Sequence, residues 1–258
     1  MDAEERDRQS IDDEHLLERG IDPSSDDPRP LAAMARRLHS LYESAKAGRV
    51  IDPPVEFLYA KAEASLARLT GMRLACRKGC AHCCHVWVSA TAPEILFLAK
   101  HVRARGIGAQ DSVHAAHALT GKYSFSIRAL HPSPCPMLAE DVCTIYEHRP
   151  MSCRFAASPD DYACRRVMRE FSRETMPLSL RHLQGRGIYE VAGAIALRHA
   201  GFPHFHYELN AGLSRALERE DTETAWLAGE DVFAGCQRDP RDVLQGQGVP
   251  ELTKLAFG

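Results

Sequence analysis

The sequence predicts a mainly α protein, an irregular helical domain built around a cysteine-bound metal centre with at most a short β-hairpin. Apolar residues recur at helical spacing along most of the chain, and glycine and proline stand where these stretches end. Four cysteines also crowd into the nine residues 76–84, which a hydrophobic core does not require. With 258 residues, 45% of them hydrophobic, the chain is long enough to bury a sizeable core.

Residues 1–30 are predicted to be an acidic arm that is solvated and partly disordered. They hold eleven acidic residues against four basic ones, together with three prolines. A single helical domain is expected over residues 31–236, with the cysteine-cluster metal-binding core at 70–170. Residues 237–258 are expected to form a C-terminal tail.

Two helices are expected between this arm and the first cysteines. Apolar stripes cover residues 31–42, before Gly48, and residues 58–69, before Gly71. Residues 91–94 (Thr-Ala-Pro-Glu) then form a capping box with proline in the first turn, so a third helix begins there and runs to Gly106.

The remaining elements follow from shorter signals. A two-strand hairpin is expected within residues 137–146, and Ser158-Pro159-Asp160-Asp161 is expected to cap a helix that carries Cys164. Further helices are expected near residues 110–121, 188–199, 207–219 and 222–233.

The first chemical signal is the spacing Cys-x3-Cys-x2-Cys-Cys, made by Cys76, Cys80, Cys83 and Cys84. Thiolates bind soft and borderline metals, and four at this spacing can converge from either a helix end or a loop. Gly79 favours the loop or helix end. We interpret the segment as a metal-binding knuckle in preference to a disulfide or a set of buried thiols.

The second signal is a set of cysteines in more varied settings. Prolines at 132, 134 and 136 hold Cys135 on a stiff, extended loop, and Arg149-Pro150 starts a turn that presents Cys153. Cys143 and Cys164 complete the set, whereas Cys236 stands alone and is expected to be a spare thiol.

Charge and sequence pattern exclude several classes of protein. The net charge of -3 and pI of about 6.5 give no basic excess, so general nucleic-acid binding is not expected. No apolar run reaches the roughly 18 residues of a membrane span, and the N-terminus lacks the hydrophobic core of a secretory signal. Nine cysteines without an export signal are typical of a reducing compartment, and we expect a cytoplasmic protein.

Both cysteine segments together resemble the YkgJ-type cysteine-cluster family, described as a zinc- or iron-chelating domain. The likeness covers residues 70–170 and includes Cys-Pro-Met-Leu, Cys-x-Ile-Tyr-Glu and Arg-Pro-x-x-Cys-Arg, although the first gap here is Cys-x3-Cys. The resemblance implies that the family cysteines are Cys76, Cys80, Cys83, Cys84, Cys135, Cys143, Cys153 and Cys164. Flagellin lysine N-methylases look similar through the same cluster, which gives a second hypothesis, an S-adenosylmethionine-dependent protein lysine N-methyltransferase.

The metal and its role stay open at this point. Eight thiols suffice for two four-sulfur zinc sites or for an iron–sulfur cluster with spare thiols, and the centre would be structural or sensing. A radical S-adenosylmethionine enzyme is disfavoured because the chain lacks the strand–helix alternation of a β/α barrel. A protein partner is a further open hypothesis. The basic residues beside the cysteines would either offset thiolate charge or form surface ion pairs: Arg77, Lys78, Arg149, Arg154 and Arg165.

Overall fold

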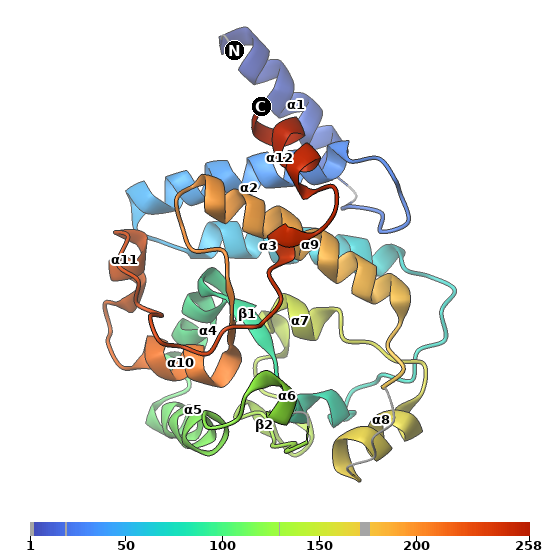
Figure 1. Cartoon of the computed structure of the whole chain (residues 1–258), viewed down its shortest axis with the longest axis vertical. Coiled ribbons are helices and arrows are strands. Elements are labelled where there is room, and N and C mark those ends of the chain that lie inside the picture. The colour runs from blue at the N-terminus through green and yellow to red at the C-terminus, as the bar shows by residue number, and fades with distance from the viewer. Residues whose placement is uncertain (1–2, 19, 129, 171–175) are drawn as a thin grey trace.

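The computed structural model describes residues 3–18, 20–128, 130–170 and 176–258 (Figure 1). The described chain is mainly α-helical, as predicted, and its strands form two short antiparallel pairs. The α-helices are α1 (Ala3–Leu17), α2 (Arg29–Gly48), α3 (Asp52–Arg68), α4 (Ala92–Ala104), α5 (Ile107–Thr120), α6 (Phe125–Arg128), α7 (Met151–Arg154), α8 (Asp161–Arg169), α9 (Leu180–His199), α10 (Leu209–Leu217), α11 (Thr222–Leu227) and α12 (Val249–Phe257). The short 3-10 helices and strands are η1 (His82–His85), η2 (Tyr146–His148), η3 (Val243–Gln245), β1 (Ser89–Thr91), β2 (Leu138–Ala139), β3 (Val142–Cys143) and β4 (His206–Glu208). Within the part described, no helix combines the length and the apolar character that crossing a membrane requires.

The upper half of the molecule in Figure 1 is a layer of long helices, in which α2 packs along α9 with α3 beside them. The sequence forms α2 because Pro30 lies in its first turn and its apolar residues, including Met34, Leu38 and Tyr42, share one buried face. In α9, the buried Tyr189 hydroxyl donates to the Lys61 carbonyl of α3 at 2.7 Å. Helices α1, α4, α7 and α12 pack against this layer of long helices, the helical body.

The second group of helices is α4, α5 and α10, joined by the pairing of β1 with β4. The predicted capping box of α4 is present, with Thr91 and Glu94 each bonded to the other's backbone. Helix α10 approaches α4 closely at Gly212, where a Cβ atom would lie 2.4 Å from Ile95 Cδ1. Only glycine fits this contact without displacing Ile95.

At the N-terminus the structure differs from the predicted solvated arm. Residues 3–17 form α1, and Leu17 and Ile21 are buried. The Asp13 carboxylate is also buried and pairs with Arg36 of α2 at 2.6 Å. An acid-rich segment is therefore held against the domain by a few apolar residues near its end and by one partly buried ion pair.

The C-terminal tail differs from expectation in the same way, because it contains α12. Val249, Leu252 and Ala256 form a small apolar cluster with residues of α2 and α9. The Leu255 carbonyl accepts a hydrogen bond from Arg36 at 3.1 Å. Ordered structure therefore extends beyond both predicted boundaries of the helical domain, residues 31 and 236.

The predicted hairpin is confirmed as the pair β2–β3. Its two turn residues, Glu140 and Asp141, both have positive φ angles, 50° and 59°. Positive φ at both central residues is the requirement of the tight turn that matches strand twist. The pairing sets Leu138 opposite Cys143 and so fixes the position of one cysteine.

Candidate metal centre

The first cysteine segment follows α3 as irregular chain and ends in η1. This agrees with the predicted loop or helix end. Gly79 has a φ of 85°, which lets the chain turn, and the Cys80 amide donates to the Arg77 carbonyl at 2.9 Å. Cys76 is exposed, and Cys80, Cys83 and Cys84 are half-buried. All four thiols therefore lie on a surface-facing turn instead of in the core.

The second cysteine segment runs beside the first. The Cys135 amide donates to the Cys84 carbonyl at 2.7 Å, and the Ser133 amide donates to the His85 carbonyl at 2.9 Å. Arg128 is buried next to these two segments and donates to the carbonyls of His85 and Ser133, each at 3.1 Å. Sequence reasoning missed Arg128 because nothing in its neighbouring sequence distinguishes it from other arginines. Only the folded structure shows that this buried side chain holds the two segments together.

Backbone amides point at the sulfurs of the hairpin region. Burial raises the pKa of Cys135 to about 11, although the Met137 amide donates to its sulfur and lowers the value. Burial also raises the pKa of Cys143, against the Ile145 amide. An N–H aimed at sulfur stabilises the thiolate form, which is the form that binds metal.

Cys164 of α8 meets Cys76 through one residue. The predicted cap of α8 is confirmed, since Asp160 accepts from the Ala163 amide at 2.9 Å. Just before it, the Ser158 amide donates to Cys76 Sγ at 3.3 Å, and the Ser158 hydroxyl hydrogen-bonds to the Cys164 sulfur. Two cysteines 88 positions apart thus share contacts with a single serine.

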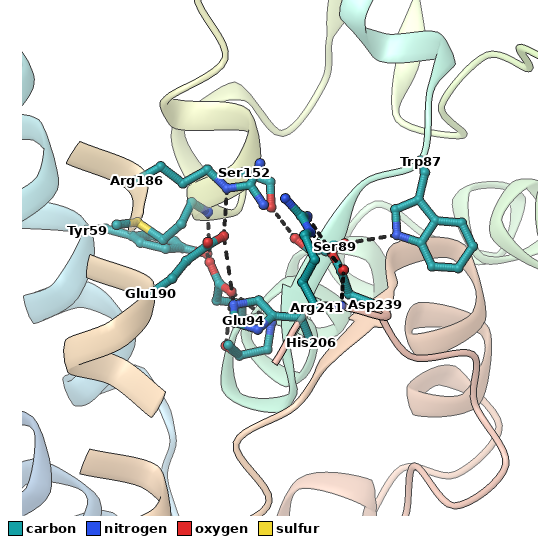
Figure 2. A network of polar contacts seen from close by, with 12 residues as sticks. Tyr59, Trp87, Ser89, Glu94, Ser152, Arg186, Glu190, His206, Asp239 and Arg241 are labelled. Carbon is teal, nitrogen blue, oxygen red and sulfur yellow. Dashed lines mark hydrogen bonds and ion pairs between the residues drawn. The ribbon is translucent and has the colours of Figure 1, made fainter. Parts of the chain in front are cut away.

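Cys153 is carried by α7, a single turn fixed to the helical body. The Met151 amide donates to Glu94 Oε1 at 2.7 Å, and the Ser152 hydroxyl donates to the Ser89 carbonyl (Figure 2). Arg154 is buried, lies 3.9 Å over the Tyr59 ring and pairs with Glu63 at 2.5 Å. The motif Arg-Pro-x-x-Cys-Arg therefore forms a turn in which the residues on either side of Cys153 bond to the helical body.

The basic residues divide between the two roles that the sequence left open. Arg154 is engaged by Glu63 and Tyr59, and Arg77 and Arg165 form surface pairs with Asp161 and Glu170: the N···O distances are 2.5, 2.9 and 3.5 Å for Arg154, Arg77 and Arg165. Arg149 does act on the thiols, because its charge opposes the burial that raises the pKa of Cys143 and Cys153. Its Nε atom is buried and has no hydrogen-bond partner among the described residues, so a donor is available to a thiolate.

The right-hand side of the network in Figure 2 fixes β1, which precedes α4. Ser89 donates to Asp239 Oδ2 at 2.6 Å and accepts from Trp87 Nε1 at 2.8 Å. Arg241 donates twice to the same carboxylate, at 2.9 and 2.5 Å. Burial alone would raise the pKa of Asp239, but the hydrogen bonds from Arg241 and Ser89 outweigh it and lower the pKa to about 2.

Replacing Asp239 with asparagine should remove a pH-dependent part of the stability. Because the folded-state pKa lies below the ordinary value of 3.8, this carboxylate stabilises the fold above pH 3.8 and loses that effect as the pH falls toward 2. We expect Asp239→Asn to lower the free energy of unfolding by about 1–2 kcal/mol at neutral pH, less than the full shift implies because Arg241 is half-exposed. Urea unfolding at pH 7 and at pH 3 should show the difference between variant and wild type shrinking at the lower pH.

The donor set fits zinc or iron in its chemistry. All nine cysteines are free thiols, and the thiolate-stabilising amides described above already point at several of them. Among the described residues, no three His, Cys, Asp or Glu side chains are yet gathered closely enough to hold an ion. Of the histidines, His85 bonds to the Ala81 carbonyl at 3.0 Å and His148 stacks on His101 at 3.5 Å. The eight-cysteine ligand set stays a prediction.

The comparisons with known proteins agree with the chemistry. Residues 75–173 match the family CxxCxxCC, whose description is "Putative zinc- or iron-chelating domain". The searches of curated proteins and of solved structures returned no match to this chain. The match confirms the cysteine-cluster resemblance inferred from sequence. The segment that carries the candidate centre, residues 75–173, is therefore similar to the CxxCxxCC family over somewhat more than a third of the chain.

Proposed function

We propose that this protein binds zinc or iron through its eight clustered cysteines and that the centre is chiefly structural. One observation carries the proposal: three cysteine-bearing segments from distant parts of the chain meet at η1 through direct contacts. Cys135 bonds to the Cys84 backbone, and Ser158 bonds to the Cys76 sulfur. Packing of a core does not require cysteine-bearing segments to lie side by side, whereas a metal site that draws its ligands from several segments does.

A structural role follows from the segments themselves. Residues 69–81 and 131–137 contain no helix or strand, so few backbone hydrogen bonds hold them in place. A bound metal would tie the thiols together and stabilise this chain, since in structural sites the free energy of metal binding is free energy of folding. Free thiols also need a reducing environment, and the proposal therefore includes the cytoplasm as its location.

Metal analysis and a visible absorption spectrum on one anaerobically purified sample test the proposal. A colourless protein with about one or two zinc ions per chain would support it in its zinc form. Iron with acid-labile sulfide and absorption near roughly 400 nm would support it in its iron–sulfur form. A folded protein without either metal, which takes up neither on anaerobic reconstitution, would overturn it.

A matched pair of variants shows whether the metal belongs to the cluster. Cys80→Ser should lower metal content and melting temperature, because one ligand is lost. Cys236→Ser should change neither, because Cys236 contacts the Ala211 carbonyl in α10, on a different part of the fold. Equal metal content and melting temperature in the two variants would argue against the cluster as the site.

A further inference from the structure

We propose that α12 is a pH-sensitive strap, docked on a pair of histidines from α2 and α9 at neutral pH and released from them at mildly acidic pH. The pair is His39 and His199, and Phe257 of α12 lies against it. This part of the chain is remote from the cysteines: in Figure 1, α12 lies at the upper end of the molecule and α8, which carries Cys164, at its lower end. The proposal therefore does not depend on metal binding.

The two histidines and Phe257 form one cluster of rings. The His199 ring stacks on the Phe257 ring, with the centroids 3.8 Å apart and an angle of 12° between the planes. The His39 ring meets both at a steep angle, 5.0 Å from His199 and 5.2 Å from Phe257. A single side chain of α12 thus shields two titratable rings from water.

The rest of the docked surface of α12 is small. Val249, Leu252 and Ala256 pack on α2 and α9 in an apolar cluster distinct from the main core, and the Leu255 carbonyl accepts from Arg36 at 3.1 Å. A helix of nine residues is too short to persist in water by itself. Release of α12 would therefore also melt it, which makes its amides reporters of docking.

The chain before α12 gives the strap a hinge. Gly246-Gln247-Gly248 joins η3 to α12, and Gly248 has a φ of 80°, in the region that glycine adopts most readily. The 3-10 helix η3 itself packs on α9. A strap that turns at residues 246–248 leaves α12 free to detach while η3 keeps its place.

The surroundings of His39 disfavour its charged form. Burial lowers the pKa of His39, and the charges of His199 and Lys46 lower it further. Glu43 acts in the opposite direction, with Oε1 3.9 Å from His39 Nε2, but the same carboxylate pairs with Lys46 at 2.7 Å. The balance therefore favours a neutral His39 in the docked state.

Other charged groups on the packed elements have partners or face solvent. Arg36, one turn before His39 on α2, pairs with Asp13 of α1. The charged residues of α12, Glu251 and Lys254, are exposed, as is Arg198 of α9. The histidine pair is thus the titratable feature that α12 contacts directly.

The sign of the pH effect follows from the lowered pKa of His39. Above the ordinary value of 6.5, the histidine is neutral whether α12 is docked or not, and docking is at full strength. Below that value the undocked form takes up a proton more readily, so docking weakens as the pH falls. One protonated histidine is tolerated beside Phe257 because an aromatic face attracts cations, whereas two charged histidines in contact repel each other.

Hydrogen–deuterium exchange on the full chain at about pH 7.5 and about pH 5.5 tests the proposal. The Leu252 amide bonds to the Gly248 carbonyl at 3.0 Å and reports on α12. Its protection factor, which corrects for the pH dependence of intrinsic exchange, should fall by roughly threefold or more at the lower pH. Amides in the centre of α9 should keep theirs, and the response should be the same with and without bound metal. Equal protection of α12 at both pH values would overturn the proposal.

A double variant isolates the histidine pair. His39→Gln keeps a polar side chain without a titration in this range, and His199→Phe keeps a ring to stack on Phe257. The double variant should retain the protection of α12 at about pH 7.5 and lose its dependence on pH. His15→Gln is the control, because this exposed histidine of α1 pairs with Glu18 at 3.6 Å, and it should respond like the wild type.

Two outcomes in the double variant would contradict the proposal. An undiminished pH response would assign the acid sensitivity to other groups, such as the Asp13–Arg36 pair. Loss of protection at both pH values would show that the imidazoles hold α12 by packing alone and not through their protonation state.

Discussion

Replacing Glu94 with alanine is expected to lower the free energy of unfolding by about 3–5 kcal/mol. Glu94 is only 2% exposed, and its side chain accepts four hydrogen bonds: from the Thr91 amide at 2.8 Å, the Thr91 hydroxyl at 2.9 Å, the Met151 amide at 2.7 Å and the Tyr59 hydroxyl at 3.4 Å. Alanine would leave these buried donors without an acceptor, at a cost of about 1–3 kcal/mol for each group. Urea unfolding followed by circular dichroism measures the loss.

Two controls separate the carboxylate from its surroundings. Glu94→Gln keeps the shape and one acceptor oxygen but turns an amide NH₂ toward backbone donors, so we expect a smaller loss of about 1–3 kcal/mol. Glu147→Ala removes an exposed carboxylate a few residues before the same turn and should change stability by less than about 0.5 kcal/mol. A Glu94→Ala variant as stable as Glu147→Ala would show that the buried network around Glu94 does not hold the fold together.

The expectations that the structure confirms depend on residues that lie close together in the sequence. Thr91 and Glu94 lie three residues apart and cap α4, and Asp160 caps α8 by bonding three residues ahead. The tight turn of the β2–β3 hairpin is likewise a property of two adjacent residues, Glu140 and Asp141. Short-range hydrogen bonds depend on residue type and spacing, which one sequence displays directly.

Features made by distant residues could not be found in the same way. Arg36 joins Asp13 of α1 to the Leu255 carbonyl of α12, across 23 and 219 positions of sequence. The acidic composition of residues 1–30 indicated solvation. Nothing in that composition shows that Arg36 of α2 pairs with Asp13. Composition describes the average environment of a segment, whereas docking depends on a few residues and their partners.

The candidate centre shows the same difference between local and long-range features. The spacing of Cys76, Cys80, Cys83 and Cys84 indicated a metal site, and the family resemblance implied the other four cysteines; the eight-cysteine ligand set stays a prediction. Which thiols approach one another depends on Ser158 and on the packing of α8 against η1, neither of which spacing reveals. The same is true of Arg154, which was a candidate for offsetting thiolate charge but instead packs on Tyr59 and pairs with Glu63.

Removing the metal should loosen the cysteine segments while the helical body stays folded. Hydrogen–deuterium exchange would be measured on the chain before and after anaerobic chelation. The amides of Cys80 and Cys84 bond to carbonyls three residues before them, and the Cys135 amide bonds to the Cys84 carbonyl of the neighbouring cysteine segment. Their protection should therefore fall by roughly tenfold or more. Amides in the centre of α2 and α9 should be unchanged, because those helices pack on each other within the main core.

The amide of Met151 makes the experiment decisive. It lies two residues from Cys153, so a role of the metal in holding α7 would expose it along with the other cysteine segments. Its acceptor, however, is the buried Glu94 carboxylate on α4, and Ser152 and Arg154 are also bonded to the body. We therefore expect Met151 to stay protected after chelation, since its local stability comes from the protein and not from the metal. Loss of protection at Met151 together with Cys135 would show that the metal also holds α7 in place, and unchanged protection at all four amides would show that the metal has no structural role.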